Sequence, residues 1–334
     1  MRTPIGLAMA ALVALAAAQA FAPRETPPLA ATRLPVECMH LNTLAATKAG
    51  LVTAGELGHL MVSSNQGGHW QRASVNQDRQ ALINQVAFAP DGLTGIAVGH
   101  EGWILRSSDG GWSWSEAAFE EKNGEPLMSV ANLPGGRWIA VGAFGRALQS
   151  GDGGKTWSPL PLPPSGVEDK HLNRIVGSPD GQYWLIVGER GLVLHSSDQG
   201  TNWTVVEPFY NGSFYNAVAL RSGGWLVYGM RGHIYRTASE TATWQRVEVG
   251  APVSFFGHAQ TGDGALRLVG QGGMVATSRD DGASFTLART GGRATLTDLH
   301  LQPDGRGWLT SDAGIKPYPP EVASAGPTSP GASR

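Results

Sequence analysis

The sequence contains a single cysteine, Cys38, among 334 residues, so no disulfide can form within the chain. It also has only 5 lysines against 20 arginines, and its formal net charge is −2. A net charge so close to zero argues against binding to polyanions through bulk electrostatics. Neither a basic stripe nor an aromatic–basic motif typical of nucleic-acid binding occurs. We expect the thiol of Cys38 to be buried in a core.

Long apolar runs are absent after the first 22 residues. Within residues 1–22, Arg2 supplies a positive start, residues 5–18 an apolar stretch and residues 20–22 a small-x-small cleavage site, a combination typical of a secretory signal peptide. The apolar stretch is too short and too rich in alanine for a good membrane span. We therefore expect a soluble chain that is exported to a periplasmic, lumenal or extracellular location.

Familiar catalytic and metal-binding patterns are also missing. There is no Gly-x-Ser-x-Gly elbow and no His-Glu-x-x-His helix, and the nine histidines show no metal-ligand spacing. We expect no cofactor and no bound metal. Because a missing motif is weak grounds against catalysis on a fold that serves many chemistries, a glycoside hydrolase of the sialidase type stays as the alternative function.

Glycine, in contrast, is abundant, with 46 residues, about twice the average usage of ~7%. Many of these glycines belong to a repeat, Ser-x-Asp-x-Gly-x-x-Trp. It occurs at 107–114, 150–157 and 196–203, at 278–285 with Phe for Trp, and in weaker copies at 63–70 and 237–244. The aromatic positions are 41 to 46 residues apart. A repeat of this length is typical of propellers and solenoids.

A Gly-x-x-Gly pair accompanies each copy of the repeat. Its second glycine stands twelve residues before the aromatic position, as Gly102 does before Trp114. The pair follows short apolar runs such as residues 95–98, which are too short for helices and are bounded by turn residues, so each unit contains a β-hairpin. Gly314, 41 residues after Gly273, marks a seventh unit that has lost its Ser-x-Asp motif.

Each unit therefore consists of strand, turn, strand, Gly-x-x-Gly, strand, Ser-x-Asp turn and strand. This order predicts an all-β fold, a seven-bladed β-propeller of four-stranded blades, over residues 37–318. The seventh unit ends after its third strand, and residues 31–36 are expected to donate the missing outer strand. Residues 23–36 otherwise form a linker, and residues 319–334, rich in Ala, Ser, Gly and Pro, a disordered tail.

The residue types of the Ser-x-Asp motif suit a structural role. Aspartate in a tight turn accepts backbone N–H groups, serine joins the same turn, and glycine adopts conformations that other residues avoid. Tryptophan can bury its apolar face between neighbouring sheets. Because one such aspartate stands on each blade, these carboxylates cannot converge on one catalytic centre. We assign the structural role to Asp109, Trp114, Asp152, Trp157, Asp198, Trp203, Asp280 and Phe285.

The motif resembles the Asp-box, or bacterial neuraminidase repeat, of sialidases and other propellers. Its recurrence with the Gly-x-x-Gly hairpin, most complete over residues 98–111, resembles the photosystem II stability/assembly factor family, and the likeness covers nearly all of residues 37–318. The resemblance implies a non-catalytic, seven-bladed propeller that binds a membrane-protein partner during its assembly. The Arg-Ile-Pro signature of sialidases has its nearest match at residues 174–176, without the proline and in the wrong blade.

The Gly-x-x-Gly hairpins should emerge together on one face of the propeller, opposite the Ser-x-Asp turns. Because arginine and aromatic side chains most often anchor interfaces, we predict a mixed, locally basic patch over the third to fifth blades that binds an acidic or polar segment of a protein partner. The candidate partner-binding residues are His100, Glu101, Arg146, Arg174, Glu189, Arg190, Arg231 and His233. Two other interpretations stay open: the tips are simply solvated charges, or the domain is a purely structural module of an envelope complex.

Overall fold

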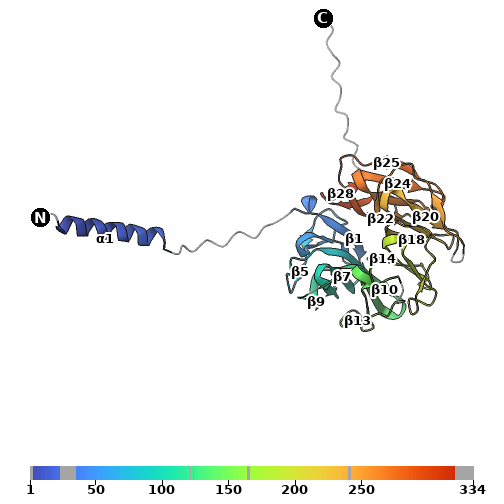
Figure 1. Ribbon diagram of the computed structural model, residues 1–334. Coiled ribbons are helices and arrows are strands. Elements are labelled where there is room, and N and C mark those ends of the chain that lie inside the picture. The colour runs from blue at the N-terminus through green and yellow to red at the C-terminus, as the bar shows by residue number, and fades with distance from the viewer. Residues whose placement is uncertain are drawn as a thin grey trace, which may run out of the picture. The chain divides into compact units, whose positions relative to one another are not determined.

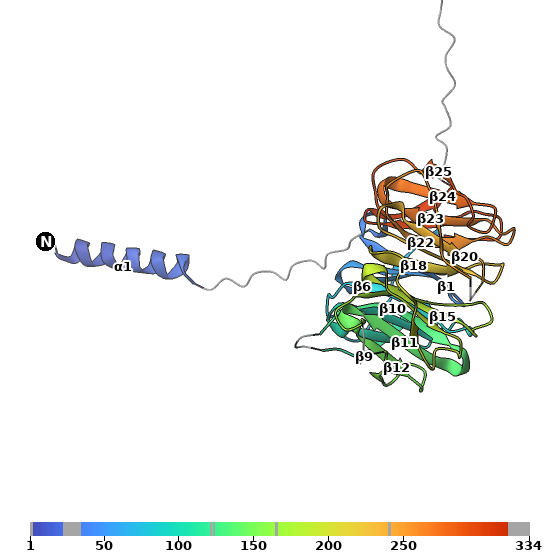
Figure 2. The same cartoon turned by 45° about the vertical axis from the view of Figure 1, so that its right-hand side comes forward.

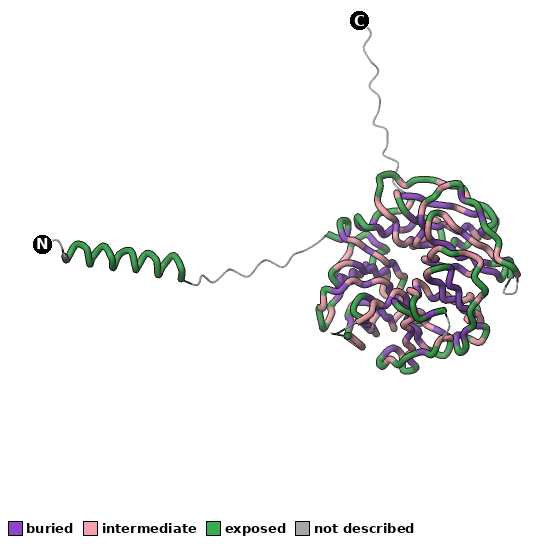
Figure 3. Tube along the Cα trace, viewed as in Figure 1, coloured by how far each residue is buried: buried purple, intermediate pink, exposed green. Residues whose placement is uncertain are grey.

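The structure, a computed structural model, describes residues 3–22, 35–120, 122, 124–163, 166–239 and 242–319. It divides into two units, Met1–Leu34 and Pro35–Arg334. The first contains the helix α1 (Thr3–Ala20), which is exposed along its length (Figure 3). Among the described helices, none combines the length and the apolar character that crossing a membrane requires. The signal peptide at residues 1–22 stays a prediction.

The second unit is a ring of seven sheets that follow one another in chain order, which confirms the predicted seven-bladed β-propeller (Figures 1 and 2). Blade 1 contains β1 (Leu41–Thr47), β2 (Gly50–Gly55), β3 (Leu60–Ser63) and β4 (Gln71–Arg72). Blade 2 contains β6 (Ile83–Phe88), β7 (Gly95–Gly99), β8 (Ile104–Ser107) and β9 (Ser113–Ala118). Blade 3 contains β10 (Leu127–Leu133), β11 (Arg137–Gly142), β12 (Ala147–Ser150) and β13 (Ser158–Pro159). Blades 4 and 5 contain β14 (Leu172–Gly177), β15 (Trp184–Gly188), β16 (Val193–Ser196) and β17 (Thr204–Val205); β18 (Phe214–Ala219), β19 (Trp225–Gly229), β20 (Ile234–Thr237) and β21 (Gln245–Val247). Blades 6 and 7 contain β22 (Phe255–Gln260), β23 (Leu266–Gly270), β24 (Met274–Ser278) and β25 (Thr286–Arg289); β26 (Leu296–Leu301), β27 (Gly307–Ser311) and β28 (Gly314–Tyr318).

The first strand of each blade is its inner strand. Inner strands of successive blades contact one another, and β26 of the last blade contacts β1 of the first, which closes the ring. Second strands such as β7, β15 and β19 are buried at every position, because the sheets of both neighbouring blades cover them. This burial explains why these strands are continuous apolar runs rather than alternating ones, and Figure 3 shows the buried residues concentrated in the strands.

The seventh blade has three strands, as its sequence indicates. Most of the expected closing strand lies outside the described residues, and Val36 at its end belongs to the short 3-10 helix η1 (Val36–Cys38). This helix packs against β28, where a Cβ atom added to Gly314 would lie only 2.0 Å from the carbonyl oxygen of Glu37. The chain that precedes the first blade therefore contacts the third strand of the last one.

Two details differ from the sequence expectations. The prediction that Cys38 is buried is wrong, because Val36 and Met39 make the buried contacts of this segment and leave Cys38 exposed. The sheet of the second blade also gains a fifth strand, β5 (Ser74–Val75), which pairs in parallel with β9. The link between the first two blades thereby covers the outer edge of the second.

Candidate functional site

The Ser-x-Asp turns are held together by their own side chains. In the second blade, the Ser107 hydroxyl accepts the backbone N–H of Gly111 at 3.0 Å and donates to the Asp109 carboxylate at 2.8 Å. Asp109 in turn accepts the N–H of Ser113 at 3.0 Å, and the Trp114 indole donates to the Gly111 carbonyl at 2.8 Å. The serine and aspartate contacts recur in blades 3, 4 and 6 around Asp152, Asp198 and Asp280.

These hydrogen bonds stabilise the charged form of each aspartate. The backbone and side-chain groups of Asn202, followed by the Ser196 hydroxyl, lower the pKa of Asp198 to about 2. The Ser284 hydroxyl and N–H do the same for Asp280, whose pKa is also lowered to about 2. A carboxylate saturated in this way is a turn-forming group and offers no proton for acid–base chemistry near neutral pH.

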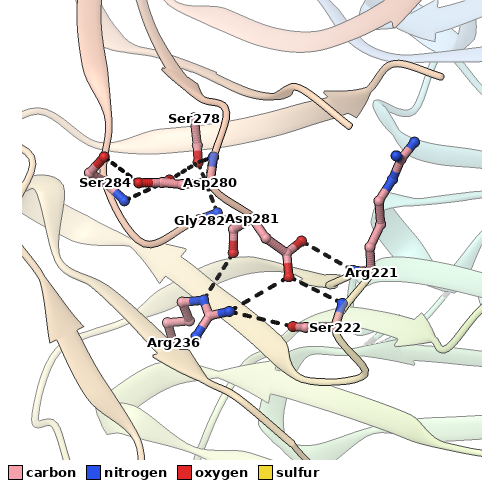
Figure 4. Close-up of polar contacts among 8 residues, drawn as sticks. All are labelled: Arg221, Ser222, Arg236, Ser278, Asp280, Asp281, Gly282 and Ser284. Atoms are coloured by element: carbon pink, nitrogen blue, oxygen red, sulfur yellow. Dashed lines mark hydrogen bonds and ion pairs between the residues drawn. The ribbon is translucent and has the colours of Figure 1, made fainter. Parts of the chain in front are cut away.

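The same turns also tie neighbouring blades together, as Figure 4 shows for blades 5 and 6. The backbone carbonyl of Asp281 accepts the Nε–H of Arg236 at 2.9 Å, and its carboxylate accepts the N–H groups of Arg221 and Ser222, each at 3.1 Å. An equivalent bond joins the last blade to the first, where the Trp308 indole donates to the Gln66 carbonyl at 2.7 Å. The turns therefore staple the ring, including its closure.

On the opposite face, the Gly-x-x-Gly turns form 3-10 helices with an unusual backbone. These are η2 (Glu56–Gly58), η3 (His100–Gly102), η5 (Ala143–Gly145), η6 (Glu189–Gly191), η7 (Met230–Gly232) and η8 (Gln271–Gly273). The middle residue of each turn is left-handed, with φ between 51° and 64°. Five of the six are not glycine: Leu57, Glu101, Phe144, Arg190 and Arg231. All five are exposed, so this face presents a set of side chains at backbone positions that favour glycine.

Four of the eight candidate partner-binding residues lie exposed on these turns: His100, Glu101, Arg190 and Arg231. No hydrogen bond or ion pair of their side chains to another described residue occurs. Phe144, which was not among the candidates, is 56% exposed and packs edge-on against His171 with ring centroids 5.1 Å apart. It adds an apolar contact surface to this face.

Three other candidates are engaged within the protein. The Arg146 guanidinium forms an ion pair with Glu120. The Glu189 carboxylate accepts the backbone N–H of His171 at 3.1 Å, and His233 Nδ1 lies 2.8 Å from the Tyr210 hydroxyl. Glu56 and Gln271 accept backbone N–H groups in the same way as Glu189, so the first residue of the turn has a structural role in these blades.

The eighth candidate, Arg174, lies on the inner strand β14 rather than on a turn. Its charge contributes, after burial, to lowering the pKa of His258 to about 3. Its charge also lowers the pKa of Tyr228 and of Asp298, which burial raises.

The sequence reasoning missed a hollow on the face of the Ser-x-Asp turns. It has a volume of about 530 Å³ and is formed by the turns between first and second strands of blades 2 to 4, including Pro90, Pro134, Pro179 and Trp184. The Pro-x-Gly turns that line it were evident in the sequence, but nothing local to them indicates that they enclose a space. Within the described ranges, no cluster of three or more His, Cys, Asp or Glu side chains could hold a metal ion.

Fold and turns together define a class of protein, a seven-bladed propeller stapled by Ser-x-Asp turns on one face and presenting side chains from Gly-x-x-Gly turns on the other. The chain belongs to the family described as "Photosynthesis system II assembly factor YCF48", whose model matches residues 62–165 and 137–315.

Solved structures with the same fold include members of this family and unrelated propellers. A structure of YCF48 bound to D1 peptide has a TM-score of 0.67 and 19% identity, covering 87% of this chain and 96% of its own. YCF48 from Cyanidioschyzon merolae has a TM-score of 0.66 and 17% identity, covering 85% and 95%. Streptogramin B lyase has a TM-score of 0.72 at 12% identity, covering 85% and 94%. At these identities the likeness shows the fold alone. No curated protein matches the chain.

Proposed function

We propose that this protein is an exported, non-catalytic propeller that binds a segment of a protein partner on its Gly-x-x-Gly face and aids the assembly or stability of a membrane-protein complex. The observation that carries the proposal is the set of exposed, left-handed tip residues. A non-glycine residue in this conformation costs about 1–2 kcal/mol, which the sixth blade avoids with Gly272. Such residues also occur in Ser-x-Asp turns, as at Gln199, but five of the six described Gly-x-x-Gly tips keep one exposed, and exposed side chains held at strained positions are typical of a binding surface.

The composition of the tips indicates the kind of partner. Arg190 and Arg231 offer planar, permanently charged donors, and neither guanidinium has a partner among the described residues. Phe144 supplies an exposed aromatic ring on the same face. This combination suits a peptide segment with carboxylate and apolar side chains. The structure of the family member YCF48 with a D1 peptide supports a protein segment as the ligand.

The test removes the tip side chains without disturbing the turns. We replace Arg190 and Arg231 together by glycine, which suits their φ values of 52° and 55°. Gln199→Gly is the matched control, because Gln199 has a φ of 58° in a Ser-x-Asp turn on the opposite face. Both variants should unfold at the same temperature as the unmodified protein or higher. Only the double variant should lose capture of a membrane-protein partner from solubilised membranes.

Undiminished capture by the Arg190→Gly/Arg231→Gly variant would contradict the proposal. The same preparation should show no turnover of a fluorogenic sialoside, and measurable turnover would favour the glycoside hydrolase instead. Export is tested by N-terminal sequencing of the mature protein, which we expect to begin at Pro23 after cleavage following Ala22.

A further inference from the structure

The third residue of the inner strand has a recurring structural role. In four blades its side chain accepts a backbone N–H group of the next inner strand, and so joins two blades near the axis of the propeller. The pairs are Thr43 with Val86 at 3.4 Å, Gln85 with Val130 at 2.9 Å, Ser129 with Ile175 at 3.1 Å, and Asp298 with Leu44 at 3.0 Å.

Arg174 occupies this position in the fourth blade and breaks the pattern, because a guanidinium cannot accept a hydrogen bond. The N–H of Ala217 in the next blade is accepted instead by the side chain of its own neighbour, Asn216, at 2.8 Å. Within the part of the chain that the structure describes, Arg174 itself makes no hydrogen bond and no ion pair. The fourth blade thus has an unpaired cation where four other blades have an acceptor that bonds to the next blade.

The surroundings show where this cation points. Side chains at the same register position in other blades reach the next inner strand, which places Arg174 beside the axis as well. The charge of Arg174 lowers the pKa of Tyr228, His258 and Asp298, which belong to three different blades, although burial is the larger influence on each. Burial raises the pKa of the Asp298 carboxyl. Arg174, His258 and Asp298 nevertheless keep intermediate exposure. Solvent therefore reaches all three side chains, although they belong to inner strands.

Asp298 forms no ion pair with Arg174. Its two carboxylate oxygens accept the N–H groups of Leu44 and Leu299 at 3.0 and 2.9 Å, which anchors the carboxylate to the backbone at the closure of the ring. His258 is held by the Tyr228 hydroxyl, 2.9 Å from its Nδ1. The neighbours of Arg174 are therefore occupied, while the five N–H donors of its guanidinium remain available.

We propose that Arg174 forms an anion site at the propeller axis that binds a carboxylate. A guanidinium pairs with a carboxylate through two parallel hydrogen bonds, and these are stronger where water is partly excluded. The carboxylate is either carried by the protein segment of the proposed function, in which case the inference rests on that function, or is a free small carboxylate. Binding of a carboxylate at Arg174 does not require the exposed residues of the Gly-x-x-Gly turns.

The experiment detects carboxylate binding through the NMR signal of the Arg174 guanidinium. In ¹⁵N-labelled protein, the Nε–H signal of Arg174 is assigned by its loss in Arg174→Gln, and sodium acetate is titrated at constant ionic strength against sodium chloride. We expect a saturable shift of this signal with acetate alone, and the same shift in Arg190→Gln. No shift, or an equal shift with chloride, would overturn the site.

Arg174→Gln provides a second readout, because it removes the unpaired charge and because a glutamine, Gln85, already occupies the equivalent position of blade 2. We expect this variant to bind no acetate and to have a higher Tm, while Arg174→Lys keeps a weaker acetate response. A Tm lower than that of the unmodified protein would show that the Arg174 side chain has a stabilising partner within the protein, and would contradict the proposal.

Two peptides identify the source of the carboxylate. An N-acetylated tetra-alanine with a free C-terminus represents a chain terminus, and N-acetyl-glutamate amide represents a side chain. Stronger saturation by either, relative to acetate, supports the site and assigns it to a protein segment, whereas a response to acetate alone supports a free carboxylate. This titration uses purified protein, so its result does not depend on capture through Arg190 and Arg231.

Discussion

Replacing Ser196 by alanine should measure what one Ser-x-Asp turn contributes to stability. The Ser196 hydroxyl is buried, accepts the N–H of Gly200 at 2.9 Å and donates to the Asp198 carboxylate at 2.8 Å. Alanine removes only the oxygen atom. The Gly200 N–H is then left buried without a partner, because the glycine packs against Leu133 and Ile139 of the preceding blade, where water has no access.

The expected loss follows from these two bonds. A buried N–H without a partner costs about 1–3 kcal/mol. The bond to Asp198 lies at the surface, where a hydrogen bond contributes less, since water replaces it readily. We expect the free energy of unfolding to fall by about 2 kcal/mol, which for a domain of this size corresponds to a decrease in Tm of about 3–5 °C.

The matched control is Thr237→Val in the fifth blade, where the motif is degenerate. The Thr237 hydroxyl donates to the carbonyls of Ser239 and Ala242 at 2.7 and 2.9 Å, and it accepts an N–H from none of the described residues, which leave out 240 and 241. Because a carbonyl tolerates a missing partner better than an N–H does, this variant should lose less than about 1 kcal/mol. Guanidinium chloride unfolding followed by tryptophan fluorescence compares the two variants. Equal losses, or a loss below ~0.5 kcal/mol for Ser196→Ala, would refute the reasoning.

Two other perturbations test the contact that closes the ring and the pKa values of the aspartates in the Ser-x-Asp turns. Gly67→Ala places a Cβ atom 2.2 Å from the Trp308 indole at a φ of 90°, so it should cost more than about 2 kcal/mol in a denaturant titration, and a variant as stable as the unmodified protein would show that the closure is looser than described. The pKa values of Asp198 and Asp280, about 2 when folded, lie below the value of ~3.9 expected when unfolded, so their contribution is present above pH 4 and is lost as the pH falls towards 2. Calorimetry between pH 2 and 7 should therefore show a steeper acid decline in Tm for the unmodified protein than for Asp198→Asn/Asp280→Asn, and parallel curves would count against these pKa shifts.

The fold was predictable because its signals are local and repeated. Both glycines of Gly-x-x-Gly and the serine, aspartate and glycine of the Ser-x-Asp turn act within spans of at most eight residues, so their spacing alone predicts hairpins and blades. The orientation of the side chains was not predictable in the same way. Arg146 pairs with Glu120, 26 residues away, and Glu189 with the backbone of His171, 18 residues away, through geometry that only the packed blades determine.

The special position of Arg174 could have been recognised from the sequence. When the inner strands are aligned by their third residue, Thr43, Gln85 and Ser129 are acceptors of hydrogen bonds, whereas Arg174 is a cation. That comparison distinguishes Arg174 from the tip arginines. It could not place the guanidinium near His258, because the distance between blades 4 and 6 depends on how the ring closes.

The inner strands of blades 4, 5 and 6 depart from the repeat, and these departures link the proposed binding face with the proposed carboxylate site at Arg174. The second residue of the inner strand is an asparagine that donates to the next blade in blades 1, 2 and 4, but it is Tyr215 in blade 5 and Phe256 in blade 6, which stack with ring centroids 5.2 Å apart. Because each contact between neighbouring units adds to the stability of a repeat fold, such exchanges give up stabilising bonds. The start of each inner strand pairs with the first glycine of Gly-x-x-Gly, so these aromatic residues and Arg174 lie at the same end of the blades as Arg190 and Arg231. A segment held by the two exposed arginines would therefore lie on the same face as the aromatic pair and Arg174.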